Sequence, residues 1–202
     1  MPAPGETPRI RPPDREKMAE GVRLFLEGCG VDLSDPNVRE TPERVARAWA
    51  EEFLDGYDKN AREVLGDFYE ERKPAADEMV VVTSIDFQSM CPHHLLPYRG
   101  VAHVAYLPSG RIVGFSRLAR LVDALGHRLI LQETLAREVA EAIRRELDSD
   151  GAAVLLEAEQ TCMTLRGERR AQARALTEAF TGAFAERADL RERFVRRIGV
   201  AR

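Results

Sequence analysis

The sequence predicts an α+β fold, in which an antiparallel four-stranded sheet carries two helices packed on one side. Two runs rich in β-branched residues, at 79–87 and 101–107, precede two stretches of helical periodicity, at 116–125 and 131–147. A further alternating run at 152–159 returns to strand character. Strand pairs with two helices between them are typical of antiparallel sheets whose helices share one face.

Length and charge set the broad class of protein. The 202 residues suit one domain, or one domain with a helical extension. The chain has 30 basic and 34 acidic residues, a net charge of −4, so we expect no nucleic-acid partner. No apolar run approaches the roughly 20 residues that span a bilayer, and no charged-then-apolar leader opens the chain. With 3 cysteines at no disulfide-like spacing, we expect a cytoplasmic protein without a membrane partner.

The N-terminal part divides into a tail and a helical region. Residues 1–13 are rich in proline, and we expect a flexible tail. Residues 14–76 form the predicted helical region, in which helical periodicity begins at Asp14. A second helix opens at Thr41 as N-cap, with Pro42 at its first position.

Residues 77–202 form the predicted sheet domain. Its first strand alternates, with Val81 and Ile85 expected on one face, and leads directly into a turn that begins at Cys91. A helix that Ser116 is expected to cap follows the second strand. The helix 131–147 and the third strand come next, and Cys162 lies just beyond that strand.

A Cys-x-x-His turn is the strongest chemical signal of the residues themselves. Cys91 and His94 are close enough in sequence to hold one metal ion from a single turn. With Cys162 they would supply two thiolates and one imidazole, which leaves the fourth position of tetrahedral zinc open to water. His93 leaves the same turn in another direction and is free to transfer protons. The alternative is that the cysteines are small buried hydrophobes and the histidines lie on a polar turn.

Two arginines are a weaker signal. Arg44 and Arg47 are three residues apart on the second predicted helix and fall on one face. By themselves they are typical of a solvated helix surface.

Several motifs occur in an order and at spacings that resemble one enzyme family. They are ETPERVAR at 40–47, CPHH at 91–94, VGFSRLAR at 113–120, LQE at 131–133 and CMTLRG at 162–167. From about Leu24 to the C-terminal helix, the chain resembles GTP cyclohydrolase I, a zinc enzyme that converts GTP to dihydroneopterin triphosphate and formate. The resemblance implies that 77–202 is a catalytic domain of the tunnelling fold. It also implies a homo-oligomer, commonly a decamer of two pentamers, with active sites between subunits.

The resemblance assigns roles to individual residues. It implies that zinc is bound by Cys91, His94 and Cys162, and that His93 transfers a proton. It implies that the guanine pocket is lined by Ser116, Gln132 and Glu133. A carboxylate there would accept from the N–H and amine of guanine and so exclude adenine. The triphosphate would be held by a basic set, because the guanidinium fork suits phosphate oxygens. This set comprises Arg44, Arg47, Arg117, Arg120 and Arg166.

The chain also departs from the family pattern. Gln160 stands where the family usually has a catalytic histidine, and glutamine does not gain or lose a proton near neutral pH. Pro92 replaces a common glutamate, and Arg117 replaces a lysine. An alanine-rich stretch, 172–184, replaces a Ser/Thr-rich segment. Its propensity favours helix, but we expect a strand followed by a helix, because tertiary pairing overrides propensity.

Three functions are compatible with these residues. The first is the full GTP cyclohydrolase I reaction. The second is a divergent hydrolase that stops at the formamidopyrimidine intermediate or uses another purine nucleotide. The third is a non-catalytic nucleotide-binding regulator. The metal-ligand set argues against the third, because a pure binder has little use for an open zinc position.

Overall fold

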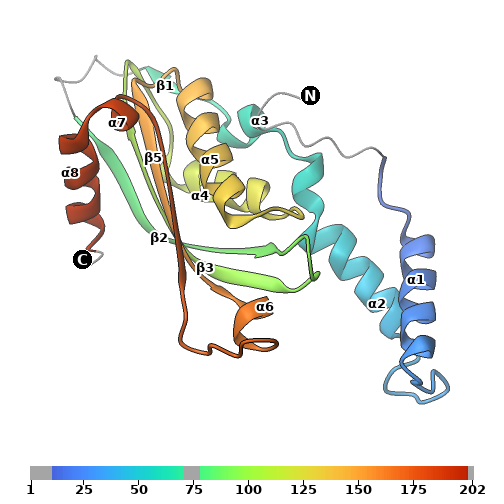
Figure 1. Cartoon of the computed structure of the whole chain (residues 1–202). Helices are drawn as coiled ribbons and strands as arrows, with labels where there is room; N and C mark the ends of the chain where they lie inside the picture. Colours follow the sequence, from blue (N-terminus) through green and yellow to red (C-terminus); the bar gives the residue numbers. More distant parts are fainter. Residues whose placement is uncertain (1–10, 71–77, 200–202) are drawn as a thin grey trace.

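The computed structural model describes residues 11–70 and 78–199, so most of the predicted tail, 1–13, lies outside the described residues (Figure 1). The N-terminal part comprises α1 (Arg15–Gly28), α2 (Thr41–Ala48), the π-helical turn η1 (Trp49–Phe53), the 3₁₀ turn η2 (Asp55–Asp58), α3 (Ala61–Leu65) and β1 (Tyr69–Glu70). The remainder comprises β2 (Val80–Met90), β3 (Pro97–Leu107), β4 (Arg111–Ile112), α4 (Phe115–Gly126), α5 (Gln132–Glu146), β5 (Gly151–Gln160), α6 (Thr161–Thr164), β6 (Ala175–Gly182), α7 (Ala183–Glu186) and α8 (Ala188–Ile198). None of the described helices combines the length and hydropathy that a membrane crossing requires.

One antiparallel sheet organises the molecule. Its strand order is β2-β3-β5-β6, and β1 pairs separately with β4. α4 and α5 lie together on one face of this sheet (Figure 1). This arrangement confirms the predicted α+β fold. The alanine-rich stretch contains the predicted strand, β6, because its backbone pairs with β5 and this pairing outweighs the helix propensity of alanine.

The main core fills the space between the sheet and these two helices. α4 contributes Leu118, Leu121 and Leu125, which recur at helical spacing and are buried. α5 contributes Leu135 and Val139 in the same way. Fully burying one such side chain stabilises the fold by about 1.5–3 kcal/mol. The predicted apolar stripes are therefore what attach α4 and α5 to the sheet.

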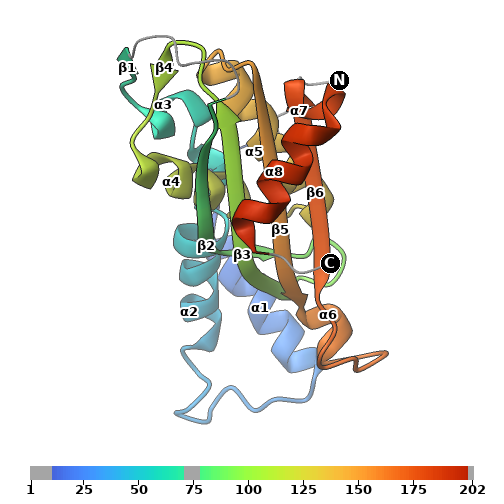
Figure 2. The same cartoon turned by 90° about the vertical axis from the view of Figure 1, so that its left-hand side faces the viewer.

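A second, smaller core lies on the opposite face of the sheet, where α8 packs across the strands (Figure 2). Phe184, Leu190 and Phe194 are fully buried there against Ala105 and Ala153. The sequence predicted two helices on one side of the sheet and a further C-terminal helix, without assigning a face to the latter. The structure adds α8 to the other side, because its apolar stripe needs a surface against which to be buried.

β2 contains a bulge that changes which side chains face each core. The register with β3 shifts between Val82 and Ile85, and Ser84 has a positive φ of 56°. Ile85 consequently joins Val82 in the main core, whereas Val81 packs against the second core. The prediction that Val81 and Ile85 share a face is therefore wrong. One extra residue in a strand reverses the alternation of every side chain beyond it.

α1 and α2 form a helical hairpin that extends away from the sheet (Figure 1). Asp14 caps α1 by accepting a hydrogen bond from Lys17 N at 3.0 Å, which confirms the predicted start of this helix. Arg128, in the loop after α4, links the helical region to the sheet domain. Its Nε donates to Gly56 O at 3.1 Å and its Nη2 to Lys59 O at 3.3 Å.

The starts of α2 and α4 differ from the predicted ones. Thr41 is the first residue of α2 and Glu40 is its N-cap, while Gly114 is the N-cap of α4 and Ser116 lies inside that helix. Neither helix has a side-chain cap hydrogen bond. In α4 the N–H of Arg117 donates to Gly114 O at 2.8 Å, so the helical turn is already closed before Ser116 could cap it.

Candidate active site

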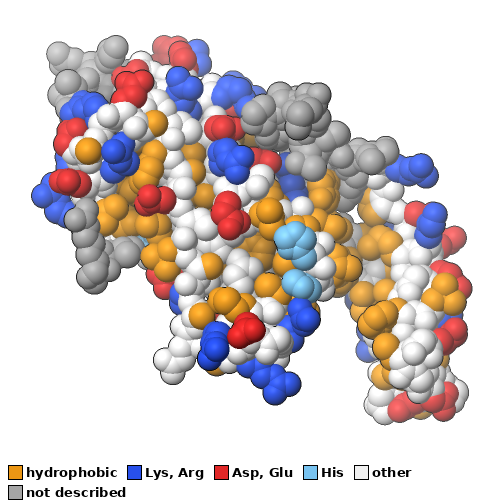
Figure 3. Space-filling model, in the orientation of Figure 1, with side chains coloured by type: hydrophobic (Ala, Val, Ile, Leu, Met, Phe, Trp, Pro, Cys, Tyr) orange, Lys and Arg blue, Asp and Glu red, His pale blue; other side chains and the backbone are white. Residues whose placement is uncertain are grey.

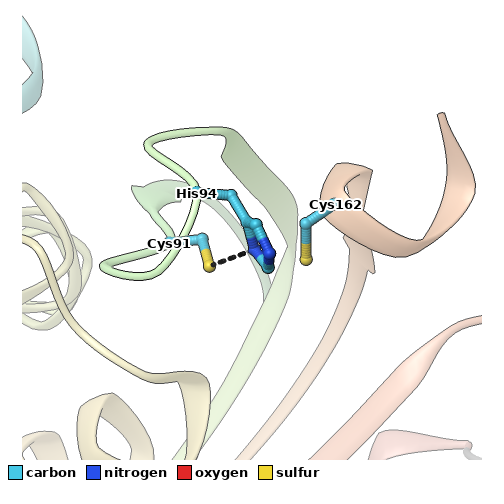
Figure 4. A group of neighbouring side chains, drawn as sticks. All are labelled: Cys91, His94 and Cys162. Atoms are coloured by element: carbon cyan, nitrogen blue, oxygen red, sulfur yellow. Dashed lines mark hydrogen bonds between the residues drawn. The ribbon is translucent and has the colours of Figure 1, made fainter. Parts of the chain in front are cut away.

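Three potential metal ligands converge at one end of the sheet. The ligand atoms of Cys91, His94 and Cys162 all lie within 4.8 Å of one another, and Cys91 Sγ is 3.7 Å from His94 Nδ1. Figure 4 shows the three side chains pointing toward one another from the β2–β3 loop and from α6. Cys91 is buried, Cys162 is partly buried and His94 is exposed. The ligand group therefore contacts the core through Cys91 and is accessible to solvent at His94.

The first two ligands come from a tight turn after β2. Leu95 N donates to Cys91 O at 3.0 Å, and Cys91 N donates to Leu96 O at 2.9 Å. Leu95 has a positive φ of 53°, which is uncommon for a residue other than glycine. This closed turn brings the imidazole of His94 back beside the thiol of Cys91.

The third ligand, Cys162, lies in α6 directly after β5, and β5 is the neighbour of β3 in the sheet. Tyr98 lies opposite Gln160 in the register of these two strands, so the start of β3 and the end of β5 are at the same edge. The hydroxyl of Thr161 donates to the carbonyl of Pro97 and holds α6 against β3. Cys162 is the next residue. Antiparallel pairing thus joins segments that are far apart in the sequence.

The donor set fits zinc. Burial raises the pKa of the Cys162 thiol, and the neighbouring Cys91 thiol raises it further. A bound cation would counteract both causes of the raised pKa, because its positive charge stabilises the thiolates, which are the form that ligates a metal. Adjacent ligand atoms of a tetrahedral zinc site lie about 3.5–3.8 Å apart, given bond lengths near 2.0–2.3 Å. The 3.7 Å separation of Cys91 Sγ and His94 Nδ1 is of this size.

His93 lies outside the ligand group. Its exposed ring is centred 6.2 Å from the ring of His94, at an interplanar angle of 82°. Within the described residues its imidazole has no hydrogen-bond partner. Figure 3 shows histidine side chains at the surface near α6, with basic side chains close by. The His93 imidazole is thus beside the candidate metal ligands and available to another molecule.

Three further predicted residues gather on the α5 side of this edge. Gln132 is buried, and its Oε1 accepts a hydrogen bond from Gln160 Nε2 at 2.6 Å. Glu133 is exposed in the first turn of α5. The phenol of Tyr98 lies within electrostatic reach of both Cys91 and Glu133. Burial raises the pKa of this phenol far above its ordinary value.

The predicted phosphate-binding residues lie in three places. Arg166 follows α6, and its charge acts on the thiol of Cys162. Arg117 and Arg120 line a cavity of about 370 Å³ beside α3, and Ser116 is next to them in α4. Arg44 and Arg47 line a groove of about 870 Å³ between α1 and α2. Among the described residues, these two cavities share no lining residue with the candidate metal ligands.

Sequence reasoning did not identify Tyr98 or the contact between Gln132 and Gln160. The Tyr98 hydroxyl donates to Ile130 O at 3.0 Å and so fixes the loop that precedes α5. The only sequence signal for Tyr98 is an aromatic residue in a strand, which is common in any core. Both contacts depend on the pairing of β3 with β5 and on the docking of α5.

Comparisons with known proteins identify the family. The sequence model of the GTP cyclohydrolase I family matches residues 18–199. A protein named GTP cyclohydrolase 1 from Ralstonia nicotianae is 42% identical over 190 residues, which cover 94% of this chain and 90% of that protein. The protein of the same name from Chromobacterium violaceum is 42% identical over 191 residues, covering 94% and 91%. That from Clostridium perfringens is 40% identical over 187 residues, covering 93% and 99%. The chain belongs to the GTP cyclohydrolase I family.

Proposed function

We propose that this enzyme opens the imidazole ring of GTP at C8 and forms 7,8-dihydroneopterin triphosphate and formate, a reaction of folate and pterin biosynthesis. The observation that carries the proposal is the convergence of Cys91, His94 and Cys162 within 4.8 Å. Together with family membership, it supports one zinc ion per chain as the cofactor. Zinc at this site would lower the pKa of a bound water to about 7 and so supply a nucleophile at neutral pH.

The residues around the ligands would bind the base and move protons. Glu133 would accept hydrogen bonds from the N–H and the exocyclic amine of guanine, which adenine does not offer in this pattern. His93 would deliver a proton to the ring nitrogen as the bond between C8 and that nitrogen breaks. The exposure of both side chains in one chain leaves them accessible to a nucleotide.

We further propose that the site is completed by a second copy of the chain in a homo-oligomer, such as a decamer of two pentamers. The end of α4 at Gly126 packs near Gln88, close to the metal-ligand turn. Arg117 and Ser116 lie near the other end of this helix, about 14–15 Å away at 1.5 Å per residue. The position of the predicted phosphate-binding arginines in cavities away from the metal ligands supports a triphosphate site shared between subunits. A monomer in light scattering at micromolar concentration would contradict it.

A single incubation tests the function. The purified protein with GTP should release formate, and a fluorescent pterin should appear after oxidation of the product. Parallel incubation with ATP tests selection of the base. Formation of neither formate nor a ring-opened product from GTP would overturn the proposal.

A second candidate function is favoured by one observation. Gln160 occupies the position two residues before Cys162, and its side chain is a neutral amide bonded to Gln132. An amide cannot give a proton to the amine that departs when formate is released. An enzyme that stops at the formamidopyrimidine triphosphate would accumulate this intermediate and release no formate, so the same incubation separates the two functions.

A further inference from the structure

Two side-chain amides meet where α5 begins. Gln132 is 3% exposed, and its Nε2 donates to Leu156 O at 3.2 Å and to Ala175 O at 3.0 Å. Its Oε1 accepts from Gln160 Nε2 at 2.6 Å. One amide therefore joins α5 to β5, to the start of β6 and to Gln160.

These partners determine which way each amide is turned. Backbone carbonyl oxygens only accept hydrogen bonds, so the NH₂ group of Gln132 must face Leu156 O and Ala175 O. Its oxygen must then face Gln160. Since two amide oxygens would repel each other, Gln160 must present its NH₂ group to Gln132. The orientation of Gln160 thus follows from donor and acceptor chemistry alone.

The oxygen of Gln160 is left for another partner. Within the described part of the chain, Gln160 Oε1 accepts no hydrogen bond, and the side chain is only partly buried. Gln160 lies opposite Tyr98 in register, so both side chains are on the sheet face whose core includes Cys91 and contacts Cys162. We propose that Gln132 is a positioning residue, which holds Gln160 so that its Oε1 accepts a hydrogen bond from a water molecule at the active site.

This role deepens the proposed function and rests on it. Formate release is the hydrolysis of a formamide. The water oxygen bonds to the formyl carbon, the carbon–nitrogen bond breaks, and the hydrogens of water end on the amine and on the acid. An oriented acceptor aligns the water for this attack but does not take its proton, because an amide is not a base near neutral pH. Gln160 would therefore order the water without transferring its proton.

Substitutions to methionine test the link, because methionine retains length and removes the amide. We would prepare Gln132→Met, Gln160→Met and the double variant, with Gln88→Met as a control on an exposed position of β2. The first measurement is the urea midpoint of unfolding. The second is the ratio of formate released to imidazole rings opened.

The positioning role predicts non-additive effects in both measurements. Either single substitution should lower the formate-to-ring ratio by about 3- to 10-fold, which corresponds to the loss of one net hydrogen bond. The double variant should be no worse than Gln132→Met in this ratio or in its urea midpoint, because Gln160 then has no bond to lose. Gln88→Met should leave the ratio unchanged. A merely structural role would lower stability without changing the ratio.

Gln160→Glu retains a side-chain oxygen that can accept from water, but its carboxylate has no N–H to donate to Gln132 Oε1. The substitution leaves the bonds from Gln132 to Leu156 O and Ala175 O in place. It should lower the ratio as Gln160→Met does, and it serves as the test if Gln132→Met fails to fold. A normal ratio in Gln160→Glu, or additive effects in the double variant, would overturn the inference. So would a wild type that opens the ring without releasing formate. If the wild type opens no imidazole ring, the proposed function is overturned instead. The urea midpoints of the variants then still test the hydrogen bond between Gln132 and Gln160.

Discussion

Arg128 Nη1 lies 3.6 Å from Glu138 Oε2, and both side chains are almost fully buried. Neither of these two atoms has a hydrogen-bond partner among the described residues. Burial lowers the pKa of Arg128 and raises that of Glu138, and the attraction between the two charges opposes both shifts. The pair joins α5 to the loop that anchors the N-terminal helical region.

Removing one member of this pair should destabilise the protein strongly. Glu138→Leu leaves the guanidinium of Arg128 buried without a counter-charge, and we expect a loss of about 3–5 kcal/mol in the free energy of unfolding. The double variant Arg128→Met/Glu138→Leu should recover part of this loss, because no charge is then buried alone, while the bonds from Arg128 to Gly56 O and Lys59 O remain lost. Urea unfolding measures both. A double variant less stable than Glu138→Leu would show that the pair is not the origin of the effect.

Zinc binding should depend on Cys162. Cys162→Ala removes one of the three proposed zinc ligands, and we expect the zinc content to fall from about one ion per chain to a small fraction. Cys29→Ala is a matched control, because Cys29 is exposed at the end of α1 and is outside the ligand group. Metal analysis after dialysis is the measurement. Equal zinc in both variants would contradict the assignment.

Base recognition should depend on Glu133. Glu133→Ala would leave the donors of guanine unpaired, and we expect GTP binding to weaken by about 1–3 kcal/mol. Stability should change little, because Glu133 is exposed and its interaction with the helix dipole is worth at most about 1 kcal/mol. Glu141→Ala, further along α5, should bind GTP normally. Calorimetric titration compares the two, and unchanged affinity in Glu133→Ala would place the guanine elsewhere.

Gln160→His should increase the output of formate and pterin. Histidine can donate the proton that the departing amine requires, and general acid catalysis contributes about 10²–10⁴-fold when it is fully restored. The Oε1 of Gln132 is already placed to accept from the introduced imidazole. Rates of formate release under saturating GTP are the measurement. A wild type that the histidine variant does not exceed would show that no proton donor is missing.

Stability should fall on acidification through His103. This histidine is 5% exposed, and its Nδ1 accepts a hydrogen bond from Ser84 N at 3.4 Å. Burial lowers the pKa of His103, and Glu157 only partly offsets this shift. A base with a lowered pKa in the folded state binds fewer protons than in the unfolded chain, so its contribution is present above the ordinary pKa near 6.5 and is lost as the pH falls through the folded pKa.

His103→Gln removes this titration and retains an acceptor for Ser84. The urea midpoint of the wild type should therefore decrease between about pH 7 and pH 5 more steeply than that of the variant. Parallel pH profiles would show that other groups carry the acid sensitivity.

The sequence by itself determined which segments form the main helices and strands, because apolar periodicity is a local property of the chain. It also determined the chemistry of the candidate metal site. Cys91 and His94 are three residues apart, which favours a shared metal ion, and the family resemblance implies Cys162 as the third ligand. The structure brings their ligand atoms together as this prediction requires.

Only the tertiary structure decided how those segments face one another. The bulge at Ser84 moves Ile85 to the other face from Val81, and α8 packs on the face of the sheet opposite α4 and α5. The bond between Gln132 and Gln160 joins α5 to the end of β5. Register, bulges and contacts between distant segments depend on free energies summed over the whole packed core. These features therefore cannot be predicted from a local pattern of residues.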